Sequence, residues 1–284
     1  MNSISLLSIP GILYSSFILS LIALWTPLKR PIVPLVSCFI LVMGLITKTY
    51  TWIVPLEIAL LLFLNFIVET ISKPFVKMLS ILGTFALAFA MSRHFLPGFH
   101  NFSFIQAEVI TPDATPYTMY WNFDKPWVSL ILLFPVSLYS ASFTGKVSHI
   151  FFIFLAALGT LLGLSYIFGY VRYDFKVPEF LWFWILNNLF ITCIAEEALF
   201  RGFLQRHFMT YMPPLVAIGI SSLFFGLLHY WGGWKYMILA TLGGLFYGYQ
   251  YHQTNRLEFS ILTHFLVNLI HLIFFTYPAL KTAF

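Results

Sequence analysis

The sequence predicts an all-α, polytopic transmembrane helix bundle of about ten spans, within a range of eight to ten. Hydrophobic residues make up 60% of the 284 positions and charged residues only 9%, whereas soluble domains carry about 25% charged residues. The mean hydropathy is +0.88. Each helical span needs about 20 apolar residues. On this criterion we expect spans at residues 5–26, 31–47, 51–70, 76–95, 126–143, 148–170, 180–205, 214–230, 235–252 and 258–277.

The first apolar stretch is predicted to stay in the protein. It has no basic residue before Lys29 and no small-residue cleavage pattern, so it does not resemble a signal peptide. The net charge of +5 fits contact with anionic lipid headgroups. Since no basic cluster resembles a nucleic-acid patch, we expect the lipid bilayer as a partner and no nucleic acid. The predicted protein is thus a multi-pass integral protein of the cell (plasma or inner) membrane.

One long polar stretch, residues 96–125, divides the chain. We therefore predict an N-terminal transmembrane scaffold at 1–95 and an extramembrane loop at 96–125. Linking transmembrane helices follow at 126–175. The polar side chains of the apolar spans concentrate after that point, so we expect residues 176–284, with the last four spans, to form the functional core.

Two adjacent glutamates and an arginine interrupt the apolar stretch CIAEEALFRGFL at residues 193–204. A charged side chain at mid-bilayer costs about 3 kcal/mol, so these residues call for an explanation. Glu197 and Arg201 stand four residues apart, which predicts an ion pair along one helix face. Glu196 stands five residues from Arg201 and is expected to lack this partner. We therefore expect Glu197 and Arg201 to support the core, and Glu196 to have a different role.

A helix hairpin is expected to place a histidine at the level of Glu196. The turn at Pro213 and Pro214 ends one helix and begins the next. Glu196 and His229 lie nearly equally far from this turn, at about 24 Å for a rise of 1.5 Å per residue. The two side chains are therefore predicted to face each other.

The last span adds a polar face. His264, Asn268 and His271 are spaced four and three residues apart, so they share one side of a helix. A polar helix face within the bilayer must point into the helix bundle and away from lipid. His252, near the end of the preceding span, is read as interfacial. Gly244 and Gly248 in that span have the spacing of close helix packing.

Together these side chains have the chemistry of a hydrolase. Glu196 can accept a proton from water and His229 can orient the water or share the base role. Asn268 and His264 can donate hydrogen bonds to a developing oxyanion. Each residue alone also fits a structural role, as an interhelical hydrogen-bond residue. Phe225, one turn before His229, either packs in the core or fixes the imidazole ring.

The same residues resemble three signatures of the CAAX-protease and bacteriocin-processing family of intramembrane endopeptidases, which includes the type II CAAX prenyl proteases. The signatures E-E-x-x-x-R, F-x-x-x-H and H-x-x-x-N occur in this order on successive predicted helices. They are Glu196-Glu197-x-x-x-Arg201, Phe225-x-x-x-His229 and His264-x-x-x-Asn268.

The resemblance covers about residues 180–276. It implies that Glu196 and His229 are catalytic and activate water, while His264 and Asn268 are catalytic and stabilise the oxyanion. It also implies proteolysis of a membrane-anchored protein or peptide substrate without a cofactor or an obligatory metal.

Other readings of this residue set stay open. Glu196, His229 and His264 could instead bind zinc in a metalloprotease, although the chain has no H-E-x-x-H helix. A non-catalytic scaffold or immunity protein would keep the fold without turnover. A bis-histidine haem protein is a more distant alternative.

Overall fold

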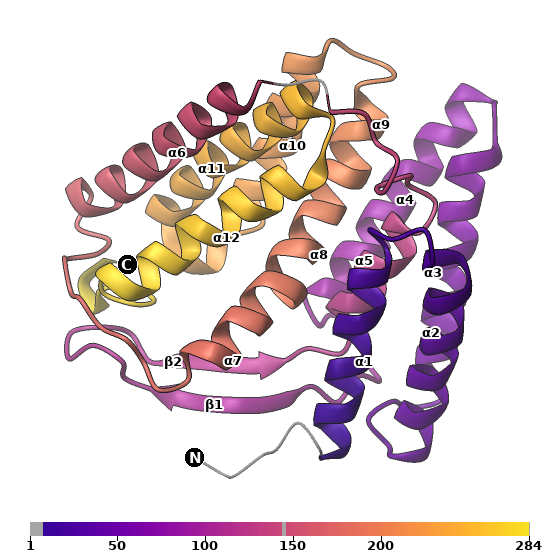
Figure 1. Cartoon of the computed structure of the whole chain (residues 1–284), viewed down its shortest axis with the longest axis horizontal. Helices are drawn as coiled ribbons and strands as arrows, with labels where there is room; N and C mark the ends of the chain where they lie inside the picture. The colour runs from indigo at the N-terminus through magenta and orange to yellow at the C-terminus, as the bar shows by residue number, and fades with distance from the viewer. Residues whose placement is uncertain (1–7, 144–145, 284) are drawn as a thin grey trace. The chain divides into compact units, whose positions relative to one another are not determined.

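The computed structural model describes residues 8–143 and 146–283, and helices make up most of them (Figure 1). The predicted all-α class is confirmed. Within the described residues, the one sheet has two strands, β1 (Phe102–Glu108) and β2 (Tyr117–Trp121), inside the stretch predicted as an extramembrane loop.

The chain forms two compact units that do not follow chain order. The first contains the described residues up to Ser103, with Tyr120–Ser140 and Phe190–Leu204. The second contains Phe104–Met119, Ala141–Leu189 and the chain from Gln205 onward. The predicted segment boundaries at residues 95, 125 and 175 stay a prediction. Residues 1–7, 144–145 and 284 of the predicted segments lie outside the described residues.

The first unit is built on antiparallel helix pairs. Helix α1 packs on α2 and α3 packs on α4, while α5 contacts α1, α3 and α4. Proline lies in the first turn of α1, α3, α4 and α5, where its missing N–H is not needed. The helices are α1 (Ile9–Ala23), α2 (Lys29–Ile46), α3 (Val54–Thr70), α4 (Pro74–Ser92) and α5 (Lys125–Leu133).

Helix α5 differs from the span expected at 126–143. It has only 9 residues, and every residue from Pro126 to Leu133 is buried. Pro135 follows closely and cannot continue the helix. An apolar stretch this short is more typical of a core helix than of a membrane span. Helix α5 is therefore part of the core of the first unit.

The remaining helices carry most of the second unit. A helix of 28 residues, Leu181–Phe208, runs through both units. It consists of α7 (Leu181–Leu186), η1 (Asn187–Cys193), α8 (Ile194–Glu197), η2 (Ala198–Gln205) and α9 (Arg206–Phe208), where η1 and η2 are π-helical. The other elements are α6 (Val147–Ile167), α10 (Pro214–Leu227), η3 (Tyr230–Gly232), α11 (Gly233–Thr254), α12 (Leu257–Phe274) and η4 (Lys281–Ala283).

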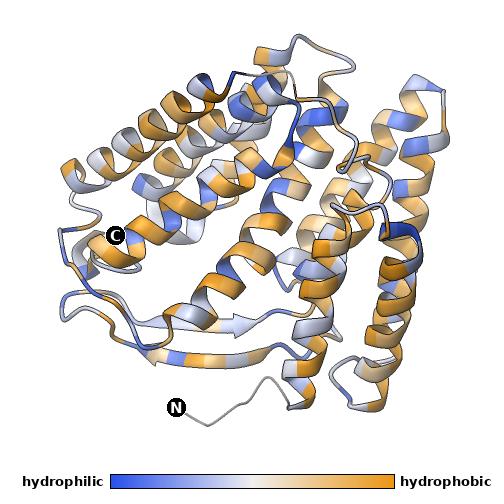
Figure 2. Cartoon of the chain, in the orientation of Figure 1, coloured by the Kyte–Doolittle hydropathy of each residue, from blue (hydrophilic) through white to orange (hydrophobic). Residues whose placement is uncertain are grey.

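The helices consist largely of hydrophobic residues, as the orange colouring of Figure 2 shows, and many of these side chains are exposed on the outside of the helices. Leu35, Phe75 and Ile167 are 72%, 75% and 75% exposed. Soluble proteins rarely expose large contiguous apolar patches. These surfaces therefore fit an integral membrane protein, with lipid in place of water.

In the described parts of the chain, five helices are long and apolar enough to cross a membrane: Lys29–Ile46, Pro74–Ser92, Val147–Ile167, Leu181–Phe208 and Leu257–Phe274. Helices α10 and α11 meet the criterion of length and apolar composition only when the bent pair is counted as one span. With this pair the number of candidate spans is up to six. Helix α1 is apolar but shorter. The count of about ten stays a prediction, and residues 5–7 of the first expected span lie outside the described residues.

Glycines allow α10 and α11 to pack closely. A Cβ atom added to Gly244 would lie 2.9 Å from the Cα of Ser222, and one added to Gly248 would lie 3.2 Å from Ile218. The close packing predicted from the spacing of these two glycines is confirmed. On α10, a Cβ atom at Gly226 would lie 2.6 Å from the carbonyl oxygen of Met237.

We expect Gly226→Ala to lower the free energy of unfolding by about 1–3 kcal/mol, the usual cost of overpacking. Gly219→Ala is the matched control, because a Cβ atom at Gly219 on the same helix has no atom within 4 Å. Thermal unfolding of both variants in detergent measures the difference. Equal stability would contradict the tight contact at Gly226.

Candidate active site

The second unit encloses a pocket with a volume of about 80 Å³. Side chains of α6, α10, α11 and α12 contribute to its lining. Its polar side chains include His229, His264, Asn268 and His271. A cavity needs only about 10–15 Å³ to hold a water molecule. The pocket is therefore large enough for water beside two of the predicted imidazoles and the predicted amide.

His229 lies just beyond the end of α10, which stops at Leu227. Its Nδ1 is 2.5 Å from the carbonyl oxygen of Phe225. Because a carbonyl oxygen only accepts hydrogen bonds, Nδ1 must carry the proton. In the neutral ring, Nε2 is then the hydrogen-bond acceptor.

Phe225 contacts both pocket histidines that the signatures contain. Its ring centroid lies 4.5 Å from that of His229 and 5.9 Å from that of His264. Its backbone carbonyl oxygen also accepts the hydrogen bond from Nδ1 of His229. Phe225 thus combines the two roles that the sequence left open, core packing and orientation of the imidazole ring.

Tyr247 of α11 is a pocket residue that the sequence analysis missed. Its ring stacks on His264, with centroids 4.7 Å apart and an interplanar angle of 13°. The Ser260 hydroxyl donates to the Tyr247 carbonyl oxygen at 2.8 Å, which joins α12 to α11. A Cβ atom at Gly243 would lie only 3.4 Å from the Tyr247 ring. The sequence signal for this residue was the group of glycines near Tyr247, which leave room for an aromatic ring.

The amide of Asn268 is held by a second asparagine. Its Nδ2 donates to Oδ1 of Asn188 at 3.3 Å. Because Nδ2 carries two N–H groups in one plane, this bond orients both of them. One turn further along α12, Nε2 of His271 lies 3.1 Å from the carbonyl oxygen of Thr276. Two of the three side chains on the polar face predicted for the last span, Asn268 and His271, thus have hydrogen-bond partners.

The first unit contains the predicted ion pair. Arg201 Nη1 donates to Glu197 Oε1 at 3.1 Å, and both side chains are 0% exposed. The predicted pairing is confirmed. The Arg201 guanidinium also lies 5.8 Å from the centroid of the Phe200 ring.

Glu196 is only partly buried, unlike Glu197. Glu196 takes part in an interaction within the folded chain. The expectation that its partner is not Arg201 stays a prediction. Helix α8 contains Glu196, and the residues Ala198–Gln205 that follow it are π-helical. Glu196 belongs to the first compact unit and His229 to the second. Their predicted pairing therefore stays a prediction.

Over residues 8–143 and 146–283, no group of three or more histidine, cysteine, aspartate and glutamate side chains is arranged to hold a metal ion. The zinc alternative has its own test. Metal analysis of the purified protein and an activity measurement after chelation distinguish the two chemistries. Stoichiometric zinc with loss of activity on chelation would establish the metalloprotease.

Comparisons with known proteins agree with the sequence signatures. Residues 178–270 match the family model described as type II CAAX prenyl endopeptidase, Rce1-like. This range contains all seven signature residues, and the resemblance found in the sequence is confirmed. No curated protein and no solved structure matches the chain. Residues 178–270 are thus similar to the Rce1-like domain of type II CAAX prenyl endopeptidases.

Proposed function

We propose that the protein is an intramembrane endopeptidase of the glutamate type, located in the cell membrane. Its substrate would be a membrane-anchored protein or peptide precursor. The matched family is a protease family, and the long apolar helices fit an integral membrane protein. These two findings support the proposed substrate class, because a protease within the bilayer meets peptide bonds of membrane-associated chains.

The proposed mechanism assigns water activation to Glu196 and His229. Glu196 accepts the proton of the attacking water. His229 accepts a hydrogen bond from the same water through Nε2, since its Nδ1 is used by the Phe225 carbonyl. The carboxylate then returns the proton to the leaving amine. No metal or cofactor takes part in these steps.

His264 and Asn268 are the proposed oxyanion donors. The observation that carries this proposal is the pocket of about 80 Å³, which His229, His264 and Asn268 line together. Stacking on Tyr247 and the bond to Asn188 restrain the His264 ring and the Asn268 amide. Donors that are held in advance stabilise a developing charge without reorganisation in the transition state.

Comparative proteomics of membrane-protein termini tests the proposed activity and identifies the substrate. Cells that express the parent, Glu196→Ala or His252→Ala are compared. His252 is the matched histidine control, because it does not line the pocket. We expect an uncut precursor to accumulate only with Glu196→Ala. Identical termini in all three strains would contradict the proposal.

We expect Asn268→Ala to lower turnover by about 10²–10³, the usual cost of one lost oxyanion donor. The variant should remain folded, because it removes a polar side chain that faces a pocket. Asn188→Ala is the matched comparison and should have a smaller effect, since Asn188 only orients the amide of Asn268. Cleavage of the purified precursor measures both. Near-normal turnover of Asn268→Ala would remove this residue from the site.

A further inference from the structure

A second tyrosine of α11, Tyr236, lines the pocket of about 80 Å³ together with His229. None of the three sequence signatures contains it. The two rings meet edge-on, with centroids 5.3 Å apart and an interplanar angle of 81°. Edge-to-face contact is one of the favourable arrangements of aromatic rings. Tyr236 therefore touches the imidazole that is proposed to orient the attacking water.

The other contacts of the His229 ring come from one residue, Phe225 on α10. The Phe225 carbonyl oxygen accepts the hydrogen bond from Nδ1, and the Phe225 ring lies 4.5 Å from the imidazole between centroids. A hydrogen bond tolerates tens of degrees of misalignment. The imidazole could therefore rock about its bonded edge and carry Nε2 away from the water. A contact from a second helix, α11, opposes this motion.

The Tyr236 ring has a firm support of its own. It stacks on the ring of Tyr170, with centroids 5.6 Å apart and an interplanar angle of 2°. Tyr170 is buried, and its carbonyl oxygen accepts a hydrogen bond from the Leu280 N–H at 3.0 Å. Tyr236 also packs against the buried apolar cluster to which Tyr170 and Leu280 belong. The ring that contacts His229 is thus held from the side of the C-terminal segment.

The turn after His229 leaves the space that this ring occupies. Gly232 lies in that turn, and its N–H donates to the His229 carbonyl oxygen at 3.0 Å. A Cβ atom added to Gly232 would overlap the Tyr236 ring. The backbone that carries His229 and the Tyr236 ring are therefore packed in direct contact.

We propose that Tyr236 is a positioning residue for His229. Its ring holds the imidazole so that Nε2 stays directed at the attacking water. This role rests on the proposed function of His229 and adds a residue that lies outside the signatures. Since Tyr236 acts through the imidazole, its loss should slow the attack of water, which kcat measures, more than it weakens substrate binding.

Two variants test the ring contact in cleavage of the precursor that the comparison of termini identifies. Tyr236→Leu removes the ring, and Tyr236→Phe keeps it. We expect Tyr236→Leu to lower kcat per folded molecule by about 10²-fold, the cost of misplacing a reacting group by about 1 Å. KM should change little, and Tyr236→Phe should retain nearly the parental kcat. An unchanged kcat in Tyr236→Leu, or an equal loss in Tyr236→Phe, would overturn the proposal.

The motion of the His229 ring provides a measurement that needs no cleavage. Solid-state NMR of the full chain in lipid bilayers, with ¹³C- and ¹⁵N-labelled histidine, reports this motion, and His229→Gln assigns the signals. We expect a rigid ring in the parent and in Tyr236→Phe, and a ring of larger motion in Tyr236→Leu. A ring that stays equally rigid in Tyr236→Leu would overturn the proposal. If the ring moves as expected but the parent cleaves no precursor, the ring contact stands and the proposed protease activity fails.

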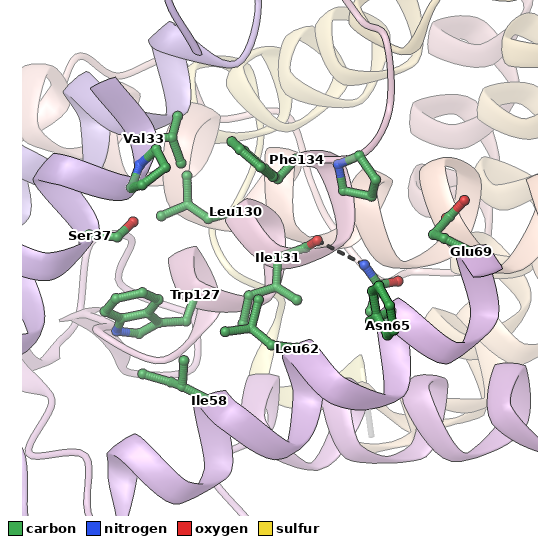
Figure 3. Close-up of a pocket in the computed structure, with 13 residues that line it drawn as sticks. Val33, Ser37, Ile58, Leu62, Asn65, Glu69, Trp127, Leu130, Ile131 and Phe134 are labelled. Carbon is green, nitrogen blue, oxygen red and sulfur yellow. Dashed lines mark hydrogen bonds between the residues drawn. The ribbon is translucent and has the colours of Figure 1, made fainter. Parts of the chain in front are cut away.

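Two further variants separate positioning from a general loss of packing. Leu280→Ala removes a buried side chain of the same apolar cluster, and Leu280 does not line the pocket. Ile58→Ala does so in the first unit, where Ile58 lines an apolar pocket of about 350 Å³ between α2, α3 and α5 (Figure 3). Both should lower thermal stability and leave kcat per folded molecule and the motion of the His229 ring unchanged. If either lowers kcat as much as Tyr236→Leu, loss of packing explains the effect and the proposal is overturned.

Discussion

Replacement of Glu196 by glutamine should reduce cleavage by about 10⁴-fold, the upper end of the range for a general base, while thermal stability changes little. Glutamine keeps the size of glutamate and loses its ability to accept a proton. Glu196 is partly exposed at α8, so the neutral side chain should fit without a large cost. The rate of precursor cleavage and the unfolding midpoint in the same detergent measure the two effects.

Glu258→Gln is the matched control for Glu196→Gln. Glu258 forms an ion pair with Arg256 at the start of α12 and does not line the pocket. Its replacement should leave the rate of cleavage unchanged. If Glu196→Gln cleaves the precursor at the parental rate, another group must activate the water.

Replacement of Glu197 by glutamine should lower the free energy of unfolding by about 3–5 kcal/mol, because it leaves a buried arginine without its counter-charge. Glu197 and Arg201 are both 0% exposed, so water cannot solvate the remaining charge. Activity should fall with the loss of folded protein. Chemical unfolding of the purified variant, with activity per folded molecule, separates the two effects.

The double variant Glu197→Gln/Arg201→Met provides the control for this effect. It removes both buried charges, so it should recover part of the lost stability. A different result would change the assignment of roles. If Glu197→Gln is as stable as the parent and completely inactive, both carboxylates belong to the catalytic centre.

The sequence predicted those features that depend on composition and on regular helical spacing. The apolar composition indicated helices in lipid, and the four-residue spacing of Glu197 and Arg201 predicted a contact within one helix. The spacing of Gly244 and Gly248 likewise indicated close packing with a neighbouring helix. These arguments need no knowledge of the tertiary contacts.

Other features depend on tertiary structure and were not predictable in this way. Apolar composition alone does not distinguish a lipid-facing helix from a buried one, so it predicts a membrane span at residues 126–143 where the structure has the buried helix α5. The hydrogen bond from His229 to the Phe225 carbonyl forms beyond the end of α10. Tyr247 reaches the pocket only because α11 packs beside α12. The glycines near Tyr247 in the sequence indicate room for its ring, but they do not identify the helix that it contacts.

The π-helical stretches give the long helix Leu181–Phe208 a change of phase. An i→i+5 turn contains one residue more than an i→i+4 turn, so side chains beyond it are shifted by one position, or about 100° around the axis. Gln205, at the end of η2, donates to the Gly248 carbonyl oxygen at 2.9 Å. Loss of one residue from a π-helical turn restores an α-helical turn, so Gln205 would keep nearly its present direction toward α11. A one-residue deletion within η2 should therefore disturb the Gln205 contact less than the same deletion in a regular α-helix, where every following side chain would rotate by about 100°.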